Sequence, residues 1–216
     1  MSLADLMIGK RGERGGGEND VKGVAIAVVT NNRDPENLGK IKVKYPWRNT
    51  EDESHWARIM TFMAGNEMGG YFLPEVGDEV LVAFENGDID QPVILGALWS
   101  GKMKPPETNS DGKNNRRLIK SRSGHLVILD DTDRSEKIEI IDKSGENLLR
   151  IDTKTNTIEI TSNKDIKLKA PNGKISLDCL ELEMKATTSA KLEANASLDL
   201  KATGNATLKG AIVMIN

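Results

Sequence analysis

The last third of the chain alternates apolar and polar residues almost without interruption. Between Ala190 and Ala202 the even positions hold alanine or leucine, and the odd positions hold charged, amide or hydroxyl residues. Successive side chains of an extended strand point to opposite faces, so a period of two predicts strand with one buried and one wet face. The same alternation runs through residues 158–170 and 174–186. The pattern predicts a long series of half-apolar strands.

These strands lack the means to form a core of their own. No aromatic residue follows Trp99 in the sequence. A single-chain β-helix would show a fixed coil period with matching turn residues, and the sequence shows none that we recognise. Three copies wound around one axis would instead place each apolar row against two identical rows and hide the sheet edges. We therefore expect an intertwined homotrimeric β-helix, or β-prism, with a core formed by Ile158, Ile160, Ile166, Leu168, Ile175, Leu177, Leu192, Leu198 and Leu200.

Five short β-rich runs precede this region, each bounded by turn residues. Asn31-Asn32 and Gly69-Gly70 are two of the boundaries, and such clusters are typical of the ends of strands. Five short strands within roughly 75 residues are typical of a small closed barrel, for which the OB type is the obvious candidate. The predicted strands are residues 23–29, 40–45, 56–62, 79–84 and 92–98.

Composition divides this all-β chain into four segments. Residues 1–22 are rich in glycine and charge and predict a flexible arm. Residues 23–99 form the predicted OB-fold barrel. Residues 100–117 carry Pro105-Pro106 and several asparagines, which do not fit inside a strand ladder, and predict a linker. Residues 118–216 form the predicted trimeric β-helix.

Charge and hydropathy disfavour several classes of protein. The chain is 38% hydrophobic and 4% aromatic, which is lean for a globular enzyme. Its net charge is −3, with basic residues interspersed among acidic ones, so we expect no nucleic-acid partner. No apolar run approaches the roughly 18 residues of a membrane span, and the N-terminus lacks a secretory signal's apolar core. We expect synthesis in the cytoplasm without a cleaved signal.

The candidate metal ligands form no convincing set. His55 and His125 lie far apart, and the single cysteine, Cys179, has no partner for a zinc site or a disulfide within the chain. Glu136 stands where a calcium loop needs glycine for its sharp bend. We expect no metal and no cofactor, although calcium-loop spacing is echoed by Asp131, Asp133, Ser135 and Asp142.

Four segments, in order, resemble a known family. They read DPENLGKIKVKYPW (34–47), WARIMTFMAG (56–65), YFLPEVGDEVLVAFENGDIDQPVILGAL (71–98) and SGHLVILDDT (123–132). They are similar to the central spike of contractile injection machines, the family of phage baseplate assembly protein V and the VgrG proteins of type VI secretion. The resemblance covers residues 23–132, and the strand-rich tail fits it. VgrG proteins carry a hub domain before the barrel, whereas we expect this chain to be the short form, which binds a separate hub protein.

The resemblance implies a structural role. It suggests a trimeric, membrane-piercing spike in a phage tail or tail-like particle, held to the hub by its barrel and in transient contact with the target membrane. A receptor-binding fibre or adhesin stays open as an alternative. So does a baseplate cell-wall glycosidase, although a barrel with short loops has little room for the cleft that such an enzyme needs. The carboxylates that would serve it are Glu75, Asp78, Glu79 and Glu85.

The alternation slips at Gly210, after which both faces become apolar. Exposed apolar surface of this kind needs a cover, and the resemblance suggests a PAAR-repeat tip protein. The alternative is that the segment closes its own core. Some short spikes of the family carry an iron-binding His-x-His at the tip, which this tail lacks. The expected docking residues are Ala211, Ile212, Val213, Met214, Ile215 and Asn216.

Overall fold

The computed structural model describes residue 21 and residues 23–48 and 51–214, and these form an all-β structure. Five strands build the first sheet, in the order β2-β1-β6-β7-β3. A two-stranded hairpin of β4 (Ala64–Gly65) and β5 (Met68–Gly69) separates β3 from β6. The expected arm lies outside the described residues except for Val21. The sheet strands are β1 (Val24–Asn31), β2 (Lys42–Lys44), β3 (Arg58–Ile59), β6 (Glu79–Phe84) and β7 (Pro92–Leu98).

This sheet curls into an OB-like half-barrel around a small aliphatic core. In β6 burial alternates with the sequence, so that Val80 and Val82 point inward and are fully buried. From β7, Ile94 joins them. Each of the five predicted runs overlaps a strand of the sheet, which confirms the predicted OB-type fold. Strand β3 is much shorter than the predicted run 56–62, since only two of its residues pair with β7, in parallel.

The loop between β1 and β2 is built around one buried carboxylate. Asp34 is 8% exposed and accepts hydrogen bonds from the backbone N–H groups of Glu36 (3.0 Å), Leu38 (2.9 Å) and Lys40 (3.2 Å). Burial alone would raise the pKa of this carboxyl, but the three N–H donors and nearby Lys40 outweigh burial, and its pKa is lowered. Asp34 therefore has a structural role, which explains the aspartate of the DPENLG segment.

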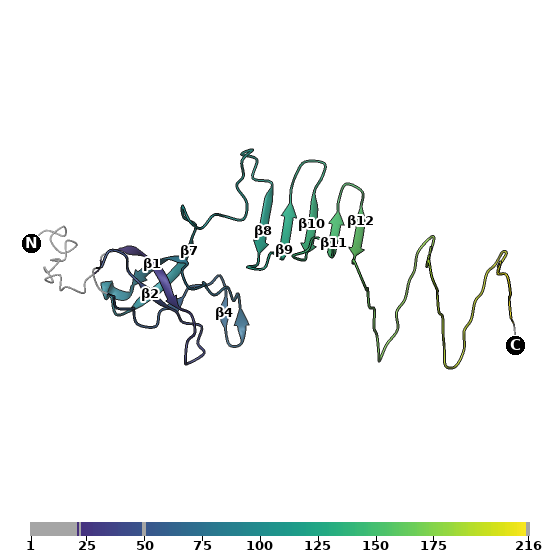
Figure 1. Cartoon of the computed structure of the whole chain (residues 1–216), viewed down its shortest axis with the longest axis horizontal. Coiled ribbons are helices and arrows are strands. Elements are labelled where there is room, and N and C mark those ends of the chain that lie inside the picture. The colour runs from purple at the N-terminus through teal and green to yellow at the C-terminus, as the bar shows by residue number, and fades with distance from the viewer. Residues whose placement is uncertain (1–20, 22, 49–50, 215–216) are drawn as a thin grey trace, which may run out of the picture. The chain divides into compact units, whose positions relative to one another are not determined.

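A second sheet follows, in which five successive strands pair antiparallel in chain order (Figure 1). Its turns include Arg134 and Asn156, both in the left-handed region that tight turns require. The sheet is consistent with the first part of a β-prism. Its strands are β8 (Arg116–Lys120), β9 (Leu126–Asp130), β10 (Lys137–Ile141), β11 (Leu148–Asp152) and β12 (Thr157–Thr161).

Contacts within the chain divide it into two units, Met1–Asn163 and Lys164–Asn216. In the second unit, residues 164–214 form extended segments joined by bends (Figure 1). Every one of these residues is exposed. The strands predicted over this region are not formed within one chain. A strand ladder needs a neighbour to share its hydrogen bonds, and a single copy provides none here.

Candidate assembly interface

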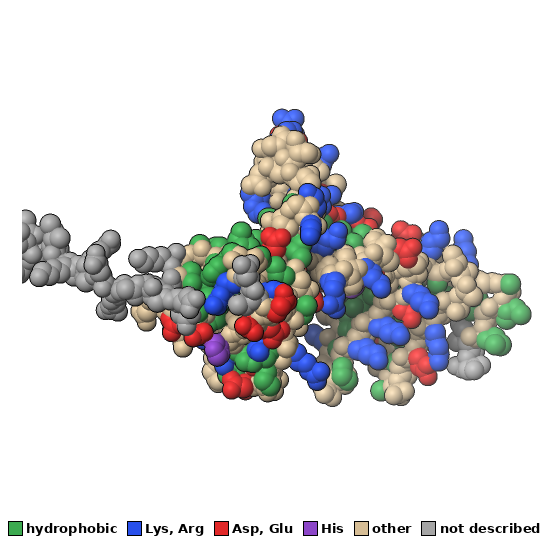
Figure 2. Space-filling view, turned by 60° about the vertical axis from the view of Figure 1, so that its left-hand side comes forward, with side chains coloured by type: hydrophobic (Ala, Val, Ile, Leu, Met, Phe, Trp, Pro, Cys, Tyr) green, Lys and Arg blue, Asp and Glu red, His purple; other side chains and the backbone are tan. Residues whose placement is uncertain are grey.

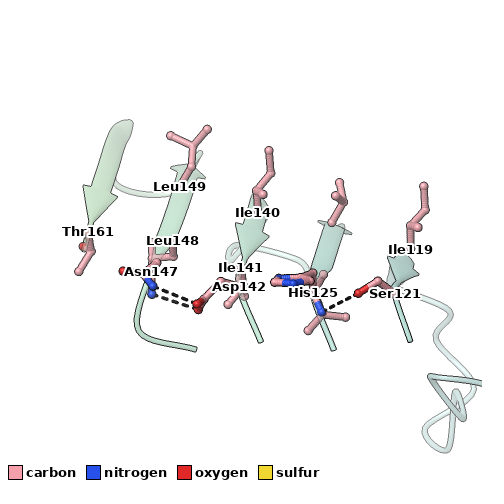
Figure 3. Close-up of a pocket in the computed structure, with 12 residues that line it drawn as sticks. Ile119, Ser121, His125, Ile140, Ile141, Asp142, Asn147, Leu148, Leu149 and Thr161 are labelled. Atoms are coloured by element: carbon pink, nitrogen blue, oxygen red, sulfur yellow. Dashed lines mark hydrogen bonds between the residues drawn. The ribbon is translucent and has the colours of Figure 1, made fainter. Parts of the chain in front are cut away.

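Strand register gives the second sheet one face that is aliphatic except for Arg117, which lies opposite Leu129 on the edge strand β8. Ile138 of β10 lies opposite Leu129 of β9 and Ile151 of β11, and that pattern continues across the sheet. Figure 3 shows Ile119, Ile140 and Leu149 pointing to the same side of three different strands. We call this the apolar face, and its aliphatic residues are 37–71% exposed in one chain: Ile119, Val127, Leu129, Ile138, Ile140, Leu149, Ile151, Ile158 and Ile160.

The opposite face of this sheet carries a row of ion pairs. Glu139 of β10 is 6% exposed, and one of its oxygens accepts a hydrogen bond from Nε of Arg150 at 2.8 Å. The Arg150 guanidinium also donates to Glu159 of β12 at 3.1 Å, while Lys137 lies 3.6 Å from Glu139. The hydrogen bond to Glu139 is the main reason why the pKa of Arg150 is raised. This second face also carries aliphatic side chains, but they are buried or half-buried within one chain: Leu118, Leu126, Ile128, Ile141 and Leu148. The apolar face, whose side chains are exposed, is therefore the face that needs a partner.

Figure 2 shows ionic side chains of both signs on one face of the molecule, with Lys and Arg the more numerous over the right-hand part of the view. The expectation that nucleic acid is not a partner stays a prediction.

The bends of the second unit recur every eight residues. They fall at residues 187–188, 195–196, 203–204 and 211–212. The sequence carries a coil period after all, so the expectation that none exists is wrong. We call the eight-residue rows that end at these bends octads, and we include one earlier row of the same kind. The octads are residues 165–172, 181–188, 189–196, 197–204 and 205–212. Their fourth and sixth positions hold a large apolar and a small residue: Leu168 with Ala170, Met184 with Ala186, Leu192 with Ala194, Leu200 with Ala202, and Leu208 with Gly210.

The core residues predicted in this unit occupy the second or fourth position of a row. Ile175 and Leu177 fit the pattern with a shift of one residue at Gly173. One chain does not bring these side chains together, and they remain 52–82% exposed. The trimer core thus stays a prediction. Among the tip residues, Ile215 and Asn216 lie outside the described residues, while Ile212 and Met214 are largely exposed.

The candidate metal ligands are engaged locally. Asp142 accepts hydrogen bonds from the side chains of Ser144 and Asn147, which hold its pKa at about 2. Nδ1 of His125 accepts the backbone N–H of Lys143 at 3.2 Å. In the part of the chain that the structure describes, no three His, Cys, Asp or Glu side chains form a group that could hold a metal ion.

Three of the four candidate glycosidase carboxylates are held in turns or ion pairs, while Glu79 is the first residue of β6. Glu75 accepts a hydrogen bond from Arg122 at 2.9 Å, and Glu85 pairs with Arg58. Asp78 accepts the backbone N–H of Glu75 at 2.8 Å, within the turn before β6.

The barrel exposes several aromatic side chains. Trp47, Phe62, Tyr71 and Phe72 are all more than half exposed, and the rings of Phe62 and Phe72 lie 6.4 Å apart. All four lie within the segments that resemble the spike family, but the sequence alone does not show that their side chains are exposed. Aromatic side chains are enriched in protein interfaces, so they make this part of the barrel a candidate contact surface.

Residues 25–99 match the model of the Type VI secretion system/phage-baseplate injector OB domain family. This part of the chain belongs to that family. The injector OB domain coincides with the half-barrel of β1–β7, and the match confirms the resemblance seen in the sequence.

Several curated proteins are similar to parts of this chain. The spike protein VgrG3 of Vibrio cholerae is 37% identical over 101 residues, which cover 43% of this chain and 10% of the relative. The spike protein VgrG2a of Pseudomonas aeruginosa is 30% identical over 122 residues, covering 52% and 14%. The actin cross-linking toxin VgrG1 of Vibrio cholerae is 37% identical over 79 residues, covering 35% and 7%. The chain thus matches only a small part of each relative. No helix in the described ranges has the length and hydropathy to span a membrane.

Proposed function

We propose that this protein is the homotrimeric central spike of a contractile injection machine. It is a structural component of a phage tail or tail-like particle. Its barrel holds the hub protein of the baseplate or tail tube, its β-helix projects as the shaft, and the shaft makes transient contact with the target membrane during piercing. Membership of the injector OB domain family and the similarity to spike proteins support this proposal.

The observation that carries the trimer is the exposed apolar face. Burying one leucine or isoleucine side chain stabilises a protein by about 1.5–3 kcal/mol, so a face of nine aliphatic side chains strongly favours association. A threefold arrangement covers all three copies of the face at once around a common core. The same arrangement supplies residues 164–214 with the strand neighbours that one chain lacks.

Light scattering on the purified full-length protein tests this proposal. We expect a single species with three times the mass of one chain, because the apolar face and the octads need two further copies. The mass should not change on dilution to nanomolar concentration. A stable, well-folded monomer, or a species with an even number of chains, would contradict the proposed architecture.

The two ends of the molecule have different proposed partners. The exposed aromatics of the barrel supply anchors for the hub, in the way that tryptophan and tyrosine dominate many interfaces. A PAAR-repeat tip protein covers residues 211–216, where the apolar side chains no longer alternate. Ile212 and Met214, which are largely exposed, support this assignment.

Capture experiments with two variants separate these partners. Trp47→Ala should weaken capture of the hub protein by roughly 10-fold or more while capture of the tip protein is unchanged. Deletion of residues 211–216 should weaken capture of the tip protein, leave capture of the hub protein unchanged and leave the trimer intact. Each variant is the control for the other. Unchanged capture of the tip protein by the deletion variant would show that residues 211–216 only close their own core.

A further inference from the structure

Alternating charges on the polar face of residues 181–204 form a checkerboard that is complete only between chains. We propose that these charges pair across neighbouring chains of the trimer and set the register in which the three chains wind. The inference rests on the proposed trimer and goes beyond it, since an uncharged polar face would allow a trimer equally well. The partner it fits is a second copy of this chain.

The charges occupy the third and fifth positions of three successive octads. Both positions lie on the polar side of the alternation, because the second and fourth positions hold the apolar residues. The sign reverses along each octad and again from one octad to the next. The three rows, in order, are Glu183 with Lys185, Lys191 with Glu193, and Asp199 with Lys201.

Pairing along a row already exists within one chain. The ammonium group of Lys191 forms an ion pair with the carboxylate of Glu193, and both side chains are well exposed. Residues two apart on a strand share a face, so the same arrangement is available to the other two rows. This contact accounts for the alternation along an octad and leaves the alternation between octads unexplained.

Threefold symmetry accounts for the second alternation. In a three-sided prism, each bend moves the chain from one side of the prism to the next. On any one side, an octad of one chain therefore lies beside the following octad of a neighbouring chain. These two strands are adjacent, and adjacent strands lie about 4.7–4.9 Å apart. Equivalent positions of successive octads therefore meet between chains. Lys191 comes to lie between Glu183 of one neighbour and Asp199 of the other.

The checkerboard distinguishes the correct register from a slipped one. The fourth and sixth positions are nearly the same in every octad, so a chain that slips by one octad still packs these side chains. The second position, which alternates between leucine and alanine, opposes the slip only through a change of side-chain size. The charges do not tolerate this slip, because octads two apart carry the same signs. Glu183 would then meet Asp199, and Lys185 would meet Lys201. Like charges directly opposite on neighbouring strands are destabilising.

Reversing the middle row tests the proposal. The double variant Lys191→Glu/Glu193→Lys keeps the composition, the net charge and the ion pair within the row, but places like charges against both neighbouring chains. We expect the midpoint of thermal unfolding of the full-length trimer to fall by roughly 5–10 °C at low salt. In 1 M salt, where the screening length is about 3 Å, most of this difference should disappear.

A matched control reverses all three rows. Changing all six charges restores opposite neighbours everywhere within the checkerboard and again leaves the net charge unchanged. At its borders, the favourable contact of Lys185 with Asp178 is lost, while Lys201→Glu gains one with Lys209. We expect this variant to recover the wild-type midpoint to within about 2 °C. If the middle-row variant yields no trimer at all, recovery of the trimer in the six-residue variant supports the proposal.

Three outcomes would overturn the proposal. A wild-type trimer whose midpoint is unchanged by the middle-row reversal shows that the apolar core or the sheet β8–β12 sets the register alone. A lower midpoint that the six-residue reversal does not restore shows that the individual side chains matter for another reason. A wild-type protein that is not a trimer rejects the proposed function, and the checkerboard with it.

Discussion

Leu198→Asp is expected to reduce the yield of trimer to a few per cent of wild type or less. In the proposed shaft, Leu198 occupies the second position of an octad and faces the axis, so threefold symmetry brings three carboxylates together in an apolar core. Burying unpaired charge is among the most destabilising changes that a protein can undergo, and three like charges compound the cost. Size-exclusion chromatography with light scattering after matched expression measures the yield.

Ser197→Asp provides the control for this prediction. It introduces the same charge one residue earlier, at a position that the alternation places on the polar face. We expect trimer yield and mass close to wild type, because an exposed carboxylate on this face stays hydrated. Equal tolerance of the two substitutions, or equal damage from both, would contradict the assigned faces of the octads.

The second large effect concerns the barrel. Ile94→Ala is expected to destabilise it by about 2–5 kcal/mol, because the substitution removes three buried carbons and leaves a cavity in the core. Ile94 is 0% exposed, and its strand β7 lies between β6 and β3. Denaturant unfolding followed by tryptophan fluorescence isolates this effect, since Trp47, Trp56 and Trp99 lie in the barrel or at its end.

Ile26→Ala is the matched control for the barrel. The chemical change is the same, but Ile26 of β1 is 50% exposed and outside the core cluster. We expect a loss of less than about 1 kcal/mol. Similar losses for the two variants would mean that the core does not lie on the side of the sheet where the structure places it.

The barrel could be predicted closely from the sequence because its strands alternate between clear turn signals. The predicted runs at 79–84 and 92–98 coincide with β6 and β7. The hairpin of β4 and β5 was missed, since its two-residue strands contain Gly65 and Gly69 and carry no alternating pattern. The buried role of Asp34 was also invisible, because its hydrogen bonds are to backbone groups that a sequence does not display.

The octad repeat was present in the sequence but hidden by a stronger signal. A period of two dominates the tail and masks a period of eight, because eight is a multiple of two. The bends do not share matching turn residues, which are the usual sign of a coil repeat in a sequence. They fall at Thr187-Thr188, Asn195-Ala196, Thr203-Gly204 and Ala211-Ile212. The repeat resides in the size of inward side chains, where leucine or methionine precedes a small residue by two positions.

The second sheet has a consequence for the order in which a spike of this kind assembles. Its five strands pair with their neighbours in sequence, so β8–β12 can form within one newly made chain, and single hairpins form in about 1–10 μs. Residues 164–214 have no such local route, and in the proposed trimer their pairing waits for encounters between chains. Three preformed sheets that meet through their apolar faces would bring the three copies of residues 164–214 together in parallel. Pairing between chains could then proceed residue by residue from Lys164 onward. Before that encounter the tails are open to proteases and to pairing with the wrong chain, so the speed of the sheet encounter governs how much newly made protein survives.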